Sequence, residues 1–115
     1  MAKAQKGKGD AFMKEAEALL NKKSWFGSKS KNAEDAAEIY EQAANSYKVG
    51  GLNQEAGDAY SKSAAIYRDT LSDFNSASKS LNNAGTCYKK ANPIDAVTAY
   101  RQAISLYVDN ARITQ

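Results

Sequence analysis

Small residues and tyrosines recur along the chain at a spacing that marks one face of a helix. Counting from Ala36, tyrosines follow at offsets of 4 and 11 residues, and small residues follow at offsets of 7 and 8. An α-helix has about 3.6 residues per turn, so these offsets fall on a single stripe along its surface. Small residues on that stripe let a neighbouring helix come close, and the rings fill the remaining space. The pattern predicts a helix that packs on its neighbours through this stripe.

The same template fits four times, starting at Ala36, Ala56, Ala77 and Ala96, so that successive starts are 20, 21 and 19 residues apart. In the last repeat, Ile104 takes offset 8 in place of a small residue. Every tyrosine of the sequence occupies offset 4 or 11, and Leu81 takes the one such position without a tyrosine. Two helices of this length make a unit of about 40 residues, close to the 34-residue tetratricopeptide repeat. The sequence therefore predicts an all-α fold, a right-handed tetratricopeptide-like solenoid of about five antiparallel helices.

Capping residues give the expected limits of these helices. Asn32 is expected to cap a helix that has Asp35 at its third position, and the pair Gly50-Gly51 is expected to end that helix. Asn92 is expected to cap a later helix that starts with Pro93. The repeats are then expected to form helices over residues 32–49, 53–69, 73–90 and 93–109. A less regular first helix is expected over 11–22, with Asp10 as its cap.

The expected domain organisation is a disordered basic tail over residues 1–9 followed by one solenoid over 10–115. Five helices are an odd number, and residues 111–115 show no capping helix, although terminal helices of such stacks need polar outer faces. The pattern indicates the N-terminal part of a longer solenoid.

The segment from Asn21 to Lys31 breaks the pattern and is expected to form a loop, exposed over 23–31. It contains the only tryptophan, Trp25, next to Phe26, and neither belongs to the repeated stripe. Either these rings fold back and plug the open end of the solenoid, or they form an exposed wedge for a membrane surface, where flanking lysines are attracted to anionic lipid. The predicted membrane-contact residues are Trp25, Phe26, Lys22, Lys23, Lys29 and Lys31. Two rings and a few lysines give only weak, reversible binding.

Composition excludes several classes of function. The net charge of +3 is too small for a typical nucleic-acid-binding domain. The positive charge is concentrated at one end, because residues 1–31 contain eight lysines and three acidic residues, whereas the rest of the chain contains eight basic and ten acidic residues. With no histidine, the chain lacks imidazole for acid–base catalysis or for zinc. Cys87 is the only cysteine and is expected to be a buried thiol. We expect no enzyme, no cofactor, no metal site and a cytosolic location.

Several segments in this order resemble the N-terminal part of the soluble NSF attachment proteins. They are residues 15–20 (EAEALL), the loop Trp25-Phe26-Gly27, residues 36–40 (AAEIY) with 43–45, Ala84-Gly85 before residues 88–91 (YKKA), Asn92-Pro93 with Ala96, residues 103–107 (AISLY), and Arg112.

The resemblance implies an adaptor that coats the SNARE helical bundle, recruits the hexameric ATPase NSF, and lies on the cytosolic face of membranes as a peripheral protein. It also implies that Trp25 and Phe26 touch the membrane and that Arg112 meets the acidic SNARE surface. The C-terminal bundle that engages NSF in this family has no counterpart in these 115 residues. The alternative is a generic tetratricopeptide-like scaffold that binds peptides.

Overall fold

The computed structural model describes residues 2–22 and 28–114, and this part of the chain folds into five α-helices without any strand. The helices are α1 (Ala2–Asn21), α2 (Ser28–Val49), α3 (Asn53–Asp69), α4 (Phe74–Ala91) and α5 (Pro93–Thr114). The all-α prediction is confirmed, and the four repeats each form one helix.

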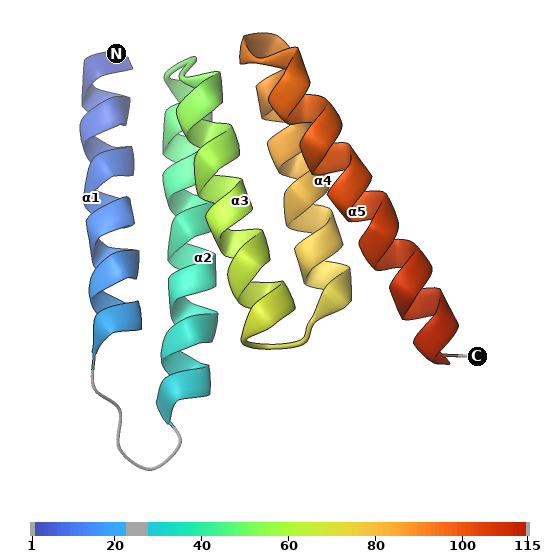
Figure 1. The fold of residues 1–115 in the computed structure, drawn as a ribbon. Helices are drawn as coiled ribbons and strands as arrows, with labels where there is room; N and C mark the ends of the chain where they lie inside the picture. Colours follow the sequence, from blue (N-terminus) through green and yellow to red (C-terminus); the bar gives the residue numbers. More distant parts are fainter. Residues whose placement is uncertain (1, 23–27, 115) are drawn as a thin grey trace.

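The helices form a thin, fanned stack, in which α3 and α5 lie in front of α2 and α4 while α1 flanks α2 at one edge (Figure 1). The Cα positions extend over 47 × 37 × 15 Å. Each described helix packs extensively only against its neighbours in sequence. This nearest-neighbour packing is the defining property of a solenoid, so the predicted helical solenoid is confirmed.

The small residues of the stripe form the contact between helices. All four starting alanines are buried, and so are the residues at offset 7: Ala43, Ser63, Ala84 and Ala103. Tyrosines 40, 47, 60 and 88 are buried, and Tyr67 and Tyr100 are partly buried against the core. Tyr107 is 47% exposed, because it lies on α5 and no helix of the described chain packs on the far side of α5.

Three of the tyrosine rings pack directly on glycine backbone of the adjacent helix. A Cβ atom added to Gly9, Gly57 or Gly85 would lie 2.5 to 2.6 Å from a ring carbon of Tyr47, Tyr88 or Tyr100, respectively. Only glycine leaves room for a ring at such a distance, because carbon atoms otherwise pack at about 3.5 Å or more. The repeated stripe therefore has a second component, a glycine on the partner helix, which the spacing of the tyrosines alone did not indicate.

The residue after each of these glycines holds the hydroxyl of the same ring. Tyr47 Oη donates to Asp10 Oδ1 at 2.5 Å, and Tyr88 Oη donates to Asp58 Oδ1 at 2.6 Å. In the third pair, the hydroxyls of Tyr100 and Thr86 are 3.2 Å apart. Each glycine thus lets the ring approach, and the polar side chain after it gives the hydroxyl of that ring a hydrogen-bond partner.

The prediction of a disordered tail over residues 1–9 is wrong for residues 2–9, which form the first two turns of α1. This segment is helical because it packs on α2: Gly9 is buried under the ring of Tyr47. Asp10 does not cap the helix but lies within it, where its carboxylate accepts from Tyr47 and, at 2.9 Å, from Lys6. These contacts use small and polar residues, so no hydrophobic pattern revealed them.

The start of α2 also differs from the prediction. The helix begins at Ser28, so Ser28–Lys31 belong to its first turn rather than to a loop, and Asn32 lies inside the helix rather than at its cap. Asp35 pairs with Lys31 across one turn at 3.2 Å, a spacing that supports helix. At the other end of the chain, α5 continues five residues beyond the predicted limit of 109, to Thr114.

The remaining predicted boundaries agree with the structure to within one residue. α2 ends at Val49, and Gly51 adopts a φ of +76°, which favours glycine. Asn92 Oδ1 accepts from the backbone N–H of Asp95 at 3.3 Å, directly before the helix that starts with Pro93. Asp73 caps α4 by accepting from the backbone N–H of Ser76 at 3.1 Å.

Candidate functional site

Three of the four predicted membrane-contact lysines lie where α1 ends and α2 begins. Lys22 follows α1 directly, and Lys29 and Lys31 lie in the first turn of α2; all three are exposed. Lys31 pairs with Asp35, and its hydrogen bond to that carboxylate raises the pKa of the Lys31 ammonium group. Neither Lys22 nor Lys29 has an ion-pair partner within residues 2–22 and 28–114. Two uncompensated ammonium groups therefore lie at this end of the stack.

Lys22 and Lys29 border a cavity of about 240 Å³. Its wall is partly apolar and partly polar, and it draws on three helices or their ends: Leu19, Leu20, Lys22, Lys29, Asn32, Ala33 and Thr70. Leu19 and Ala33 also belong to the core cluster between α1 and α2, so packing fixes their positions. The three other predicted membrane-contact residues, Lys23, Trp25 and Phe26, lie outside the described residues.

Arg112 lies in the last turn of α5 and is exposed. In Figure 1, this end of α5 lies at the same end of the stack as the end of α1 and the start of α2, but at the opposite edge. The structure thus separates the predicted SNARE contact from the lysines of the predicted membrane contact.

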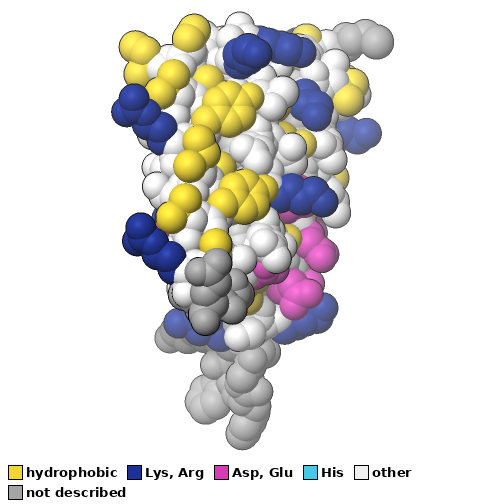
Figure 2. Space-filling model, turned by 90° about the vertical axis from the view of Figure 1, so that its right-hand side faces the viewer, with side chains coloured by type: hydrophobic (Ala, Val, Ile, Leu, Met, Phe, Trp, Pro, Cys, Tyr) yellow, Lys and Arg dark blue, Asp and Glu magenta, His cyan; other side chains and the backbone are white. Residues whose placement is uncertain are grey.

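The outward face of α5 carries a band of exposed apolar side chains (Figure 2). They are Ile94, Val97, Ile104, Tyr107 and Val108, with exposed fractions between 45% and 78%. Ile104 and Tyr107 occupy offsets 8 and 11 of the repeat that starts at Ala96, where the template predicts packing. Ile94, Val97 and Val108 lie outside the template, and their signal in the sequence is a second set of apolar residues along the same helix.

Two grooves with different linings lie on the two faces of the stack. Between α3 and α5, Arg68 and Arg101 line a shallow groove together with Leu106. Between α2 and α4, the groove is lined by Glu34, Glu38, Tyr67, Leu71, Asp73 and Ser76. Arg68 and Arg101 are 33 residues apart in the sequence, so only the structure shows that they line the same groove.

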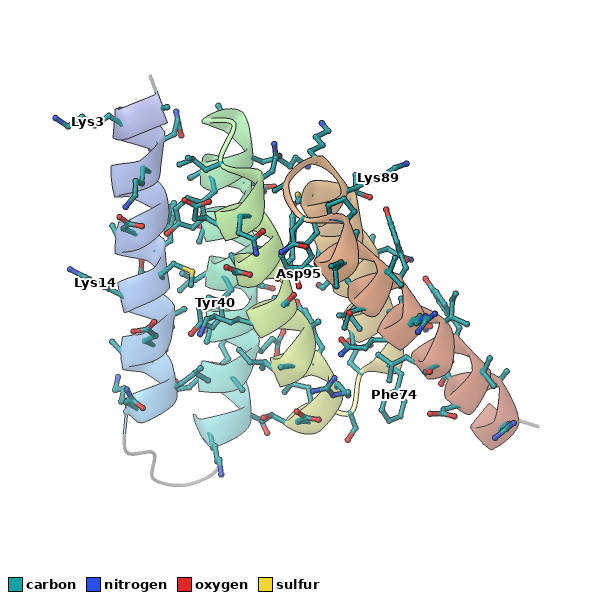
Figure 3. The ribbon with its side chains drawn as sticks, turned by 45° about the horizontal axis from the view of Figure 1, so that its top comes forward. Lys3, Lys14, Tyr40, Phe74, Lys89 and Asp95 are labelled. Atoms are coloured by element: carbon teal, nitrogen blue, oxygen red, sulfur yellow. The ribbon has the colours of Figure 1, made fainter. Side chains whose placement is uncertain are left out.

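Polar links between the helices use most of the buried hydroxyls. Glu41 accepts from Ser63 at 3.1 Å and from Ser80 at 3.4 Å. Burial and the nearby Glu41 carboxylate raise the pKa of Tyr67 to about 12. Across the front face, Gln54 donates to Asp95 at 3.1 Å, and Figure 3 shows Asp95 on the side of α5 next to α3. These contacts hold helices together.

Cys87 is buried, as predicted, and burial raises the pKa of its thiol, which disfavours the reactive thiolate. The described residues contain no group of three or more histidine, cysteine, aspartate or glutamate side chains placed to hold a metal ion. Within the same residues, each helix is too short or too polar to cross a membrane.

The stack of helices places this chain in the class of α-solenoid proteins, and comparison with known proteins defines the family. The sequence model described as "Soluble NSF attachment protein, SNAP" matches residues 7–115. The chain therefore belongs to the soluble NSF attachment protein family.

A curated relative agrees with this assignment. The chain is 35% identical over 105 residues to the alpha-soluble NSF attachment protein of Vitis vinifera. The match covers 91% of this chain and 35% of the relative. The chain thus spans about a third of the length of the relative that it matches.

Proposed function

We propose that this chain is an adaptor that binds SNARE complexes and takes part in recruiting the NSF ATPase for their disassembly. The observation that carries the proposal is the family match over residues 7–115, which includes the aromatic segment and Arg112. An adaptor needs accessible surfaces rather than a catalytic centre, and the exposed Arg112 at the end of α5 supplies a positive charge for an acidic partner.

Charge reversal at Arg112 tests the SNARE contact. Arg112→Glu should weaken retention of the chain by immobilised SNARE complex, with the larger loss at low salt, because exposed charges are screened within about 10 Å at 0.1 M. Lys14→Glu is the matched control: it makes the same charge change on the outer face of α1, where Lys14 points away from the stack (Figure 3). Equal retention of both variants would remove Arg112 from the binding surface, and no retention of the unmodified chain would contradict the adaptor role.

We also propose that the connection between α1 and α2 binds membranes through Trp25 and Phe26, with help from Lys22, Lys23, Lys29 and Lys31. The two unpaired lysines at this end support the proposal, because each lysine near an anionic surface contributes about 1 kcal/mol. Membrane binding of this size is reversible, as an adaptor requires.

The double variant Trp25→Ser with Phe26→Ser separates the two interpretations of the aromatic pair. If the rings enter the membrane, the variant binds less to neutral and anionic vesicles alike, and its melting temperature changes little. If the rings instead plug the solenoid, the melting temperature falls and co-flotation with vesicles is unchanged. The second result would exclude the membrane contact.

The groove that contains Arg68 and Arg101 favours one other function, a peptide-binding scaffold that takes acidic segments. Competition distinguishes the two functions. A short acidic peptide that displaces the chain completely from SNARE complex, in a manner that depends on Arg68 and Arg101, would favour the scaffold. Binding to SNARE complex that such peptides do not affect would favour the adaptor.

A further inference from the structure

The cavity between the end of α1 and the start of α2 has a lining that combines apolar side chains with two lysines. Leu19, Leu20 and Ala33 are its apolar lining residues, and Lys22 and Lys29 are its basic lining residues. We propose that this cavity binds the phosphate of an anionic phospholipid headgroup. The proposal rests on the membrane contact proposed above and adds to it a defined ligand.

The charges of the cavity favour a phosphate. Lys22 and Lys29 have no ion-pair partner in the described part of the chain, whereas Lys31, two residues further along the same helix, is held by Asp35. A phosphate brings between one and two negative charges and can accept hydrogen bonds from both ammonium groups. Asn32 and Thr70 also line the cavity, and their side chains carry donors that could serve the remaining oxygens.

The volume of the cavity limits the size of the ligand. About 240 Å³ corresponds to about eight water molecules at roughly 30 Å³ each. That space suits a phosphate with the adjoining glycerol carbons and is too small for a complete acyl chain. The acyl chains would stay in the bilayer while the headgroup enters the cavity.

The apolar part of the wall favours a lipid over a free phosphate. A free phosphate ion gains nothing from Leu19 and Leu20, because it has no apolar surface to bury. Leu20 is 43% exposed, so part of the apolar wall faces solvent when no ligand is bound. The glycerol carbons of a phospholipid would cover this surface while the phosphate meets the lysines.

Vesicle binding of single variants tests the cavity against general attraction to a charged surface. The probes are phosphatidylcholine vesicles with and without phosphatidic acid, and the readout is the gain in binding that phosphatidic acid produces. Lys29→Gln should reduce that gain about fivefold, and Lys22→Gln with Lys29→Gln about thirtyfold. Lys14→Gln is the matched control with the same loss of charge, and it should reduce the gain less than about twofold, since Lys14 does not line the cavity and points away from the stack (Figure 3).

A variant without any charge change gives a second test. Asn32→Leu keeps the net charge and approximate size and removes one donor from the cavity, so it should reduce the gain about tenfold. Circular dichroism of each variant checks that the helices remain folded. Equal effects of Lys29→Gln and Lys14→Gln, or no effect of Asn32→Leu in a folded chain, would overturn the cavity proposal and leave only general electrostatic attraction.

Two further outcomes separate this proposal from the others. Binding to phosphatidylcholine that phosphatidic acid does not increase would overturn the cavity proposal and leave the aromatic membrane contact intact. Glycerol 3-phosphate at matched ionic strength is the soluble comparison. One outcome is that glycerol 3-phosphate abolishes the gain in vesicle binding at concentrations where chloride does not, and shifts the backbone amide NMR signals of Lys29 and Asn32 as strongly as vesicles do. In that case the ligand is a free phosphate and the lipid assignment is wrong.

Discussion

Replacing Gly57 by alanine puts a methyl group against the ring of Tyr88. Its Cβ would lie 2.5 Å from two ring carbons and 2.8 Å from a third, where carbon atoms normally pack at about 3.5 to 4.0 Å. The ring has little freedom to move, because it is buried and its hydroxyl is held by Asp58 at 2.6 Å and Ser61 at 3.2 Å. The clash must therefore be relieved by moving α4 away from α3.

The expected loss of stability combines two opposing effects. Overpacking of a well-packed core costs about 1 to 3 kcal/mol, and the three short contacts at Gly57 place this variant near the upper limit. Alanine in a helix interior regains about 1 kcal/mol relative to glycine. The free energy of unfolding should therefore fall by about 2 kcal/mol, which corresponds to roughly 8 °C in melting temperature for a domain of this size.

Gly7→Ala makes the same substitution where the new methyl group has space. A Cβ at Gly7 has no other atom within 4 Å, so only the helix preference remains, and the melting temperature should rise by about 4 °C. Thermal unfolding followed by far-ultraviolet circular dichroism measures both variants. If Gly57→Ala raises the melting temperature as Gly7→Ala does, the ring of Tyr88 does not pack on Gly57, and the explanation of the glycine–tyrosine pairs is wrong.

Two further predictions concern the tyrosines. Tyr60→Ala should lower the free energy of unfolding by about 3 to 5 kcal/mol, because the ring is buried and its hydroxyl donates to Asn45. Tyr107→Ala should lower it by only about 1 kcal/mol, because that ring is half-exposed. Similar melting temperatures for the two variants would contradict the buried stripe. The hydrogen bond from Tyr47, and to a smaller extent the one from Lys6, lowers the pKa of Asp10 below its ordinary 3.8. The stability that this carboxylate contributes is therefore present above about pH 4, and it is lost as the pH falls through the lower pKa of the folded state. Asp10→Asn should therefore flatten the decline of melting temperature with acid, and an unchanged acid decline would show that the contact does not matter for stability.

The repeat was readable from the sequence because each helix buries the same positions. Ala36 and its three equivalents are all buried, and so are the residues seven positions later. Periodicity of this kind depends on neighbours along the chain, which the sequence displays directly. The ends of the helices were less readable, because α1 and α2 begin earlier than their capping signals indicated.

The contacts that extend α1 involve residues that hydrophobic patterns do not register. Gly9 and Asp10 hold the ring and the hydroxyl of Tyr47, which is 37 residues away from Asp10 in the chain. A glycine followed by a polar residue recurs at Gly57-Asp58 and Gly85-Thr86, each opposite a tyrosine of the next helix. That dipeptide is a sequence signal, but its meaning depends on a partner helix whose register only the structure fixes.

The candidate site was predictable only in part. Four lysines around two aromatic residues pointed to the connection between the first two helices. The cavity beside it could not be foreseen, because its wall combines Leu19, Asn32 and Thr70 from the ends of three different helices. Which lysine is available for a ligand also depends on the structure, since the extra turn at the start of α2 pairs Lys31 with Asp35.

The two outermost helices of the described stack differ in the faces that they turn away from it. Lys3 and Lys14 point outward from α1 (Figure 3), and Gly7 between them has open space around it, so this face is polar and small. The outward face of α5 instead exposes Ile94 and Ile104, at 78% and 61% (Figure 2). A terminal helix of a solenoid needs a polar outer face, because nothing covers it, whereas an internal helix is apolar on two sides. By this criterion α1 has the surface of a capping helix, and α5 has the surface of a helix that packs on both sides.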